Sequence, residues 1–208
     1  MLANLAPGFR DSVTQSQQVF HQAMMAMANP GQVFRLNALI EQAPKPLSPA
    51  AAALILALAD FETPVWLDEP LCSNAEVAHF LRFHTGAPLI ERPDLAAFAL
   101  ISAPQDLKNG FGHFAQGSAE YPDRSTTLIL QCDNIANSAG FELSGPGIAG
   151  VRHLDFAPQP PDFMSFRHAN QTQFPCGIDI FGLTGFDIFG LPRSTKIKGA
   201  PGKGDACM

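Results

Sequence analysis

Apolar residues recur at helical spacing near the start of the chain. Val13, Phe20, Met24 and Met27 fall on one face of a helix, and the Asn-Pro-Gly sequence at residues 29–31 ends it. A helix with a single apolar face usually buries that face against the rest of the protein. We therefore expect this face, its methionines included, to pack into the core.

Three start signals place the helices of the first half of the chain. Ser-x-x-Gln at residues 12–15 and Ser-x-x-Glu at residues 73–76 are capping boxes, and Ser-Pro at residues 48–49 supplies an N-cap followed by proline in the first helical position. The second helix is expected to end near Asp60 and the third near Phe83. The first half of the chain is therefore predicted to be mainly helical.

Two runs of β-forming residues near the end, 178–183 and 186–191, predict a hairpin with Thr184-Gly185 as its turn. That turn sets residue 183 opposite 186, 181 opposite 188, and Asp179 opposite Gly190. Because side chains alternate along a strand, Asp179 and Asp187 then point to opposite faces, each among apolar residues. Buried charge needs a partner. Two interpretations stay open: one aspartate meets solvent and the other caps a neighbouring loop, or Asp179 forms part of a pocket floor.

Strands are expected to dominate the second half of the chain. The sequence predicts them there at residues 127–132, 141–144 and 151–156, after two earlier strands at 63–67 and 97–101 and a loop at 108–117. Helices followed by strands indicate an α/β fold, a mixed β-sheet flanked by helices. One domain spanning residues 1–208 is expected, with flexible ends at residues 1–8 and about 199–208.

Composition narrows the possible functions. The chain has 46% hydrophobic residues, 15% charged residues and a net charge of -6, whereas nucleic-acid binding calls for a broad basic face, so no nucleic-acid partner is expected. The longest apolar run, residues 50–59, is about half as long as the ~20 residues that a bilayer span needs, so no membrane partner is expected. The 17 phenylalanines indicate a dense aromatic core or an apolar interface.

The sequence lacks the residue patterns that several kinds of cofactor or metal site require. The four cysteines show no C-x-x-C spacing and no signal peptide precedes them, which predicts the reducing cytoplasm. No lysine lies in a buried apolar segment that suits a Schiff base, so no cofactor is expected. No metal is predicted either, because His79 and His84 are five residues apart and point to different sides of a helix. Residues 199–204 match only half of a phosphate-binding loop and are interpreted as tail.

Ten residues offer cations, hydroxyls and amides, the groups that bind phosphate oxygens. They make up a candidate anion pocket: His84, Thr85, Gly86, Arg124, Gly145, Gly147, Asp179, Arg193, Ser194 and Thr195. A plain tight turn at 144–147 and an Arg193 that braces an interface are the structural alternatives. Lys196, Lys198 and Lys203 are expected in a loose tail, with binding of a small polyanion as the alternative. No catalytic residue is assigned, since no nucleophile with an oriented base is evident.

The C-terminal motif is the most distinctive one in the chain. Phe174-Pro175-x-Gly177-Ile178-Asp179 leads to Leu191-Pro192-Arg193-Ser194-Thr195, and further motifs precede it in order at residues 26–31, 62–67, 83–89, 121–124, 127–130 and 143–148. Together they resemble the PhnH family over about residues 9–198. His21 and Asn29 depart from the basic residues that the family often carries there, so no phosphate role is carried over to those two positions.

The resemblance implies a place in organic phosphonate catabolism. PhnH proteins are subunits of the carbon-phosphorus lyase core complex, which couples methylphosphonate to ATP, displaces adenine and forms α-D-ribose 1-methylphosphonate 5-triphosphate. It implies the other core subunits as partners. An isolated chain is expected to close its apolar surface on itself as a symmetric homodimer, and the groups of the candidate anion pocket make a phosphorylated small molecule the candidate ligand. It also implies a fold like the large domain of fold-type I pyridoxal-phosphate transferases, without that cofactor.

Two functions are compatible with these residues and motifs. The first is a non-catalytic subunit that stabilises the assembly or binds a ligand. The alternative is a stand-alone phosphonate or nucleotide transferase, in which Asp179 acts as base and Arg193 binds phosphate. Turnover by the isolated chain distinguishes them.

Overall fold

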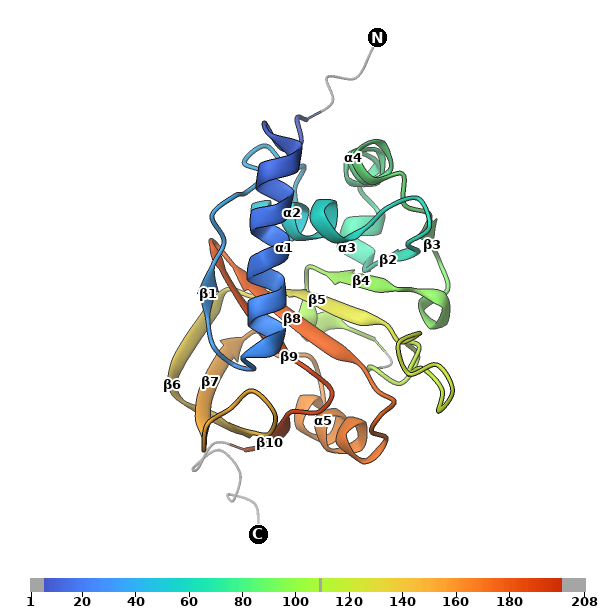
Figure 1. Ribbon diagram of the computed structural model, residues 1–208. Helices are drawn as coiled ribbons and strands as arrows, with labels where there is room; N and C mark the ends of the chain where they lie inside the picture. Colours follow the sequence, from blue (N-terminus) through green and yellow to red (C-terminus); the bar gives the residue numbers. More distant parts are fainter. Residues whose placement is uncertain (1–5, 109, 200–208) are drawn as a thin grey trace.

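The computed structural model describes residues 6–108 and 110–199, which form two β-sheets and five α-helices (Figure 1). The larger sheet has the order β1-β9-β8-β5-β4-β2-β3. Its strands are β1 (Phe34–Arg35), β2 (Val65–Leu67), β3 (Leu89–Ile90), β4 (Phe98–Ile101), β5 (Thr127–Gln131), β8 (Asp179–Thr184) and β9 (Asp187–Leu191). Strands β3, β2, β4, β5 and β8 run parallel, and β9 and β1 continue the sheet antiparallel, so the predicted mixed sheet is confirmed.

The two faces of this sheet bury separate cores. One face is covered by α1 (Ser12–Ala28), α2 (Pro49–Leu58), α3 (Glu69–Cys72) and α4 (Ala75–Thr85). The other is covered by α5 (Phe163–Thr172) and by a three-stranded sheet of β6 (Asn134–Ser144), β7 (Arg152–Ala157) and β10 (Lys196–Lys198). Short 3-10 turns, η1 (Pro93–Leu95) and η2 (Pro104–Asp106), flank β4. No helix in the described part of the chain has the length and apolarity to cross a membrane.

The predicted hairpin is present, but its register was wrong. The turn lies at residues 185–186, so Leu183 faces Ile188, Phe181 faces Gly190 and Thr184 faces Asp187. Moving a two-residue turn by one position shifts the strand pairing by two, which preserves the face of every side chain. Asp179 and Asp187 therefore do lie on opposite faces, as predicted.

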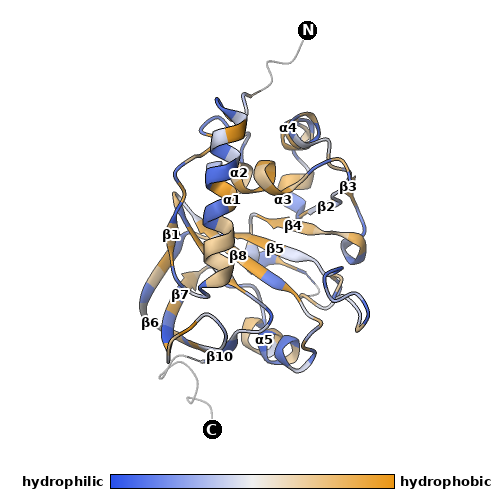
Figure 2. Cartoon of the chain, viewed as in Figure 1, coloured by the Kyte–Doolittle hydropathy of each residue, from blue (hydrophilic) through white to orange (hydrophobic). Residues whose placement is uncertain are grey.

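The predicted core face of α1 was wrong at three of its four residues, and only Met27 packs against the core. Val13, Phe20 and Met24 are 66%, 51% and 52% exposed, whereas the buried residues are Val19, Ala23 and Ala26. A Cβ atom at Gly190 would collide with the Ala26 backbone, so α1 packs on β9 through small residues at close range. The C-terminal half of α1 carries the hydrophobic colours of Figure 2 although its outer side meets solvent.

Both capping boxes are displaced by one residue. Asp11 is the N-cap of α1 and accepts a bond from the N–H of Thr14 (3.1 Å), and Asn74 caps α4 by accepting from the N–H of Glu76 (2.9 Å). Asp and Asn cap helices as well as Ser does, and each of these two residues is adjacent to the serine that was predicted as the cap. The third N-cap, Ser48 of α2, is confirmed.

Several elements were not predicted: β1, β3, α3, α5 and β10. Lys196 and Lys198 belong to β10 rather than to a tail, and they flank the buried Ile197 at the edge of the small sheet. Lysines on an edge strand discourage pairing with other chains. Lys203, residues 200–204 and most of the expected flexible ends lie outside the described residues.

Candidate functional site

The C-terminal motif forms an ion pair between the ends of β8 and β9. Arg193 follows β9 and Asp179 begins β8, and their side chains are only 15% and 22% exposed. Nη2 of Arg193 donates to Oδ2 (2.6 Å), Nε lies 3.2 Å from both carboxylate oxygens, and the backbone N–H of Arg193 donates to Oδ1 (2.6 Å). The carboxylate therefore receives both the side chain and the backbone of the same residue.

The rest of the Arg193 guanidinium binds two remote segments. Nη1 donates to the carbonyl oxygens of Pro122 (2.6 Å) and Pro175 (3.3 Å), and Nη2 donates to Ser125 Oγ (2.5 Å). A guanidinium has five N–H donors, and here each one has an acceptor within the protein. An incoming phosphate would have to displace these bonds to bind Arg193.

An apolar groove of about 480 Å³ opens beside α1, and Asp179 forms part of its wall. It is lined by Phe20, Ala23, Met24, Met27, Leu58, Phe98, Thr127, Asp179, Phe181 and Pro192. Phe98, Thr127 and Asp179 face one another in the register of β4, β5 and β8, so they form a row across the sheet. Asp179, interpreted above as part of a pocket floor, thus lines a mainly apolar groove, and a role in ligand binding there stays a prediction.

The groove lies at the amino ends of the parallel strands, whereas open α/β sheets usually bind ligands at the carboxyl ends. At those carboxyl ends, Asp68 accepts bonds from three backbone N–H groups (2.6–3.3 Å), and burial raises its pKa although these bonds act to lower it. Gln131 accepts from the N–H of Ser48 (2.6 Å) and donates to the Pro46 carbonyl (3.0 Å). These polar groups hold loops against the strand ends.

A buried arginine of helix α5, Arg167, holds the backbone of the C-terminal motif in place. Arg167 is 1% exposed, and its Nη2 donates to the carbonyl oxygens of Pro192 (2.8 Å) and Thr195 (3.1 Å). Burial lowers the pKa of Arg167 to about 10, opposed by the nearby charge of Asp179, so it remains a cation at neutral pH. Its Nε finds no hydrogen-bond partner among the described residues. Arg167 fixes the path of the chain on both sides of Arg193.

Asn170, one turn further along α5, holds the start of β8. Its amide donates to the Ile178 carbonyl (3.0 Å) and accepts from the Ile178 N–H (2.7 Å). Gly177 is at φ 127°, and a Cβ there would lie 2.6 Å from Oδ1 of Asn170. Sequence reasoning missed Arg167 and Asn170 because the buried side of α5, at residues 163, 167 and 170, is largely polar and shows no hydrophobic period.

Other members of the candidate anion pocket lie apart from this motif. His84, Thr85 and Gly86 end α4, which Figure 1 shows at the opposite end of the molecule from α5 and β10. His84 Nε2 lies 2.9 Å from the Ala6 carbonyl, and the Thr85 hydroxyl donates to the Leu81 carbonyl (2.7 Å). These side chains already have partners within the protein.

Of the remaining residues of the candidate anion pocket, Gly145, Gly147 and Thr195 pack against neighbouring residues and Arg124 lies on the surface. Gly145 lies beside the carbonyl of Ser194, and Gly147, at φ 79°, fits against the carbonyl of Ala28, where a Cβ would collide. Thr195 is buried, and its hydroxyl has no partner among the described residues. The exposed Arg124 lies over the ring of Tyr121, 4.2 Å from its centroid.

The structure thus brings together Asp179, Arg193, Ser194, Thr195 and Gly145, and keeps residues 84–86 away from them. Anion binding by these residues stays a prediction. Within the described residues, no three His, Cys, Asp or Glu side chains cluster in a way that suits a metal ion.

The fold and the motif define a class of protein. It is an α/β domain with two sheets, in which Arg193 of the C-terminal motif forms hydrogen bonds with the loops around it and the first helix exposes apolar residues. The chain belongs to the PhnH family of bacterial phosphonate metabolism proteins, whose family model matches residues 7–198.

Two relatives support this assignment over nearly the whole chain. The chain is 36% identical over 192 residues to the α-D-ribose 1-methylphosphonate 5-triphosphate synthase subunit PhnH of Rhizobium meliloti (strain 1021), covering 91% of this chain and 94% of that protein. It is 27% identical over 191 residues to the putative C-P lyase subunit protein HtxG of Stutzerimonas stutzeri, covering 89% and 88% respectively.

Proposed function

We propose that this chain is a subunit of the carbon-phosphorus lyase core complex and is needed for making α-D-ribose 1-methylphosphonate 5-triphosphate from ATP and methylphosphonate. Its nearly full-length similarity to a protein named as a subunit of that synthase supports the proposal. The chain itself contributes assembly or ligand binding rather than catalysis.

The observation that carries the non-catalytic role is the saturation of Arg193. All five of its N–H groups and the carboxylate of Asp179 are engaged within the chain. A catalytic base needs a free lone pair, and a phosphate-binding arginine needs free donors. The charged motif is therefore better suited to holding the domain together than to turning over a substrate.

The proposal also covers the partners of the chain, its ligand, its cellular location and its relation to a known fold. The other core subunits are its partners in the assembly, a homodimer forms when the chain is isolated, and a phosphorylated small molecule is the candidate ligand. The exposed apolar residues of α1 supply a surface for such contacts. Free thiols at Cys72, Cys132 and Cys176 suit a cytoplasmic location. The parallel strands β2, β4, β5 and β8 are compatible with kinship to the large domain of fold-type I pyridoxal-phosphate transferases.

The test is co-expression of the tagged chain with the other subunits of its operon. Purified assemblies and the isolated chain are assayed for adenine release from ATP plus methylphosphonate. We expect the chain to co-purify with its partners and adenine release to require the assembly. Stabilisation of the isolated chain by ATP in a thermal melt, without turnover, would identify the ligand-binding role.

Adenine release by the isolated chain would instead support the alternative, a stand-alone phosphonate or nucleotide transferase. In that case Asp179→Asn should abolish the release. An Arg92→Ala variant, altered at an exposed ion pair remote from the motif in sequence, is the control for nonspecific damage.

A further inference from the structure

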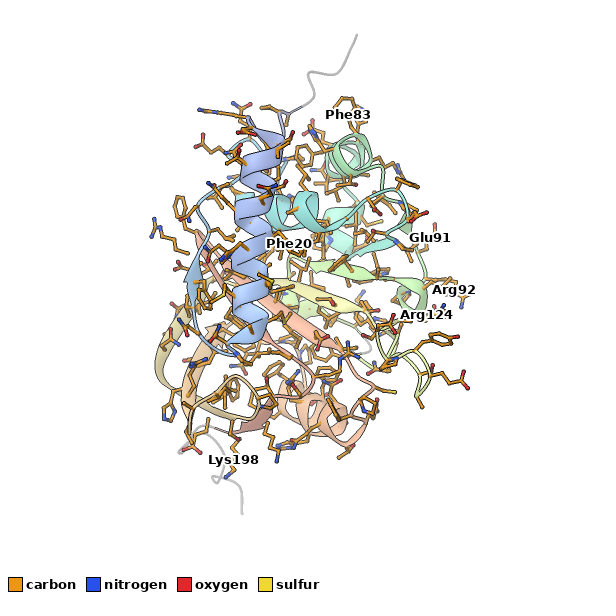
Figure 3. All side chains as sticks on the ribbon, viewed as in Figure 1. Phe20, Phe83, Glu91, Arg92, Arg124 and Lys198 are labelled. Atoms are coloured by element: carbon orange, nitrogen blue, oxygen red, sulfur yellow. The ribbon has the colours of Figure 1, made fainter. Side chains whose placement is uncertain are left out.

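Arg167 is a buried cation that forms no ion pair with any described residue. It is 1% exposed, and its hydrogen-bond acceptors are the carbonyl oxygens of Leu191 (3.5 Å), Pro192 (2.8 Å) and Thr195 (3.1 Å). The charged side chains labelled in Figure 3 lie instead at the periphery of the molecule, where water solvates them. Carbonyl groups accept hydrogen bonds but carry no net charge. A buried charge in such a place needs an ion of opposite sign.

The carboxylate of Asp179 does not fill this role alone. Burial lowers the pKa of Arg167 and the charge of Asp179 opposes that shift, so the two groups are close enough to interact. Both oxygens of Asp179, however, accept hydrogen bonds from Arg193, at 2.6 Å to 3.2 Å. Two arginines therefore share one carboxylate, and these three side chains together carry a net positive charge.

Two buried polar atoms at the contact between Arg167 and Thr195 have no hydrogen-bond partner among the described residues. They are Nε of Arg167 and Oγ1 of Thr195. In a planar guanidinium the N–H of Nε lies on the same edge as Nη2, and Arg193 uses this edge to bind Asp179. In Arg167, Nη2 donates to the Thr195 carbonyl. The unused N–H of Nε therefore points in the same direction, toward the segment that contains the Thr195 hydroxyl.

We propose that Arg167 Nε and the Thr195 hydroxyl bind a chloride ion between them. The ion accepts both hydrogen bonds and pairs with the buried cation, whereas a water molecule would satisfy the hydrogen bonds and leave the charge unpaired. Both residues are 1% exposed, which limits the ligand to a monatomic anion or one of similar size. This site is separate from the phosphorylated ligand of the proposed function and does not depend on it.

The chloride ion joins helix α5 to the end of the C-terminal motif. Figure 1 shows α5 beside β10, and the two elements pack against each other. Arg167 belongs to α5, and Thr195 directly precedes β10. Loss of the ion leaves an unpaired charge and two unpaired polar groups at this junction. The ion binds the folded chain only, so the stability of the protein should rise with chloride concentration.

Thermal unfolding of the full chain at a series of chloride concentrations tests the site. Chloride is raised from about 1 mM to about 100 mM, while gluconate, an anion too large for a buried site, keeps the ionic strength constant. For a dissociation constant of about 10 mM, the folding equilibrium shifts about tenfold and the melting temperature rises by about 3–5 °C. A melting temperature that does not respond to chloride overturns the proposal.

A matched pair of threonine variants locates the effect. Thr195→Val removes the hydroxyl without a partner, whereas Thr126→Val removes an equally buried hydroxyl that bonds the Ala96 carbonyl (2.7 Å) and the Ala115 N–H (3.2 Å). We expect Thr195→Val to lose most of the chloride response and Thr126→Val to keep it, even if Thr126→Val is the less stable variant. Equal chloride responses of the two variants overturn the site.

Bromide provides a test on the unaltered chain, which holds even if a variant fails to fold. Anomalous scattering from crystals grown in bromide should show an ion within hydrogen-bonding distance of Arg167 Nε and Thr195 Oγ1. An ordered water there without anomalous signal overturns the proposal. A bromide peak without a chloride response in solution is an adventitious ion only and also overturns it. The assembly proposed above is tested separately, by co-purification, and stands or falls independently of the ion.

Discussion

Replacing Arg193 with Met should lower the free energy of unfolding by about 3 kcal/mol. Met keeps the apolar stem but removes every side-chain bond to Asp179, Ser125, Pro122 and Pro175. Removing one partner of a buried ion pair costs about 3–5 kcal/mol, because the remaining charge stays buried. Here 22% of the Asp179 side chain meets water, so we expect the lower end of that range.

The assay is urea unfolding followed by circular dichroism and Trp66 fluorescence. A loss of about 3 kcal/mol corresponds to a melting temperature lower by about 6–12 °C for a domain of this size. The control is Arg92→Met, which removes the Arg92–Asp94 ion pair. Those side chains are 68% and 48% exposed, so the loss of stability should be much smaller than that caused by Arg193→Met. Equal stabilities of the two variants would refute the reasoning.

A double-mutant cycle separates the ion pair from the bonds to the loops. Asp179→Asn alone removes the negative charge while keeping the shape of the side chain, and the double variant Asp179→Asn with Arg193→Met removes both charges. We expect a coupling energy of about 2 kcal/mol between the two positions. Additive losses would mean that the carbonyl and hydroxyl bonds of Arg193 carry the stability and the carboxylate does not.

Three further predictions concern other positions. Asn170→Ala should destabilise the protein by about 2–3 kcal/mol, measured by urea unfolding, because both backbone groups of Ile178 lose their partner in a buried place; a loss below about 0.5 kcal/mol would contradict the contact. Gly147→Ala should destabilise it more than Gly150→Ala, since both glycines have positive φ but only Gly147 faces a backbone carbonyl, and equal melting temperatures would contradict the packing. Burial raises the pKa of the Cys132 thiol to about 12, so at pH 8 iodoacetamide should label the exposed Cys72 first and Cys132 only after unfolding, as read by peptide mass spectrometry; rapid native labelling of Cys132 would show that it is not buried.

Much of the fold could be predicted because helix, strand and turn signals depend only on residues that are close together in the sequence. The mixed sheet, the helix over residues 12–28 and the opposite faces of Asp179 and Asp187 all follow from side-chain period and turn signals. The turn position failed by one residue because both Thr184-Gly185 and Gly185-Phe186 contain the glycine that the turn needs.

Other features depend on what an element packs against, which periodicity does not report. The stripe of Val13, Phe20 and Met24 on α1 has the same pattern whether it faces a core or a partner. Helix α5 escaped detection because Arg167 and Asn170 occupy its buried side. The candidate site failed to converge on one place for a similar reason: a sequence shows that Arg193 has donors, but not that Pro122, Ser125 and Pro175 already accept them.

The pairing of β8 with both β5 and β9 has a consequence for synthesis of the chain. Strands β2 to β5 leave the ribosome long before residue 179, so the apolar edge of β5 has no neighbour during that time. Translation at about 5–20 residues per second needs about 3–11 s to go from the end of β5 at residue 131 to the end of β8 at residue 184. An unpaired apolar strand edge is a template for aggregation. A chain truncated before β8 therefore keeps the unpaired edge of β5. In a full-length chain, that edge is covered only after β8 and β9 have been synthesised.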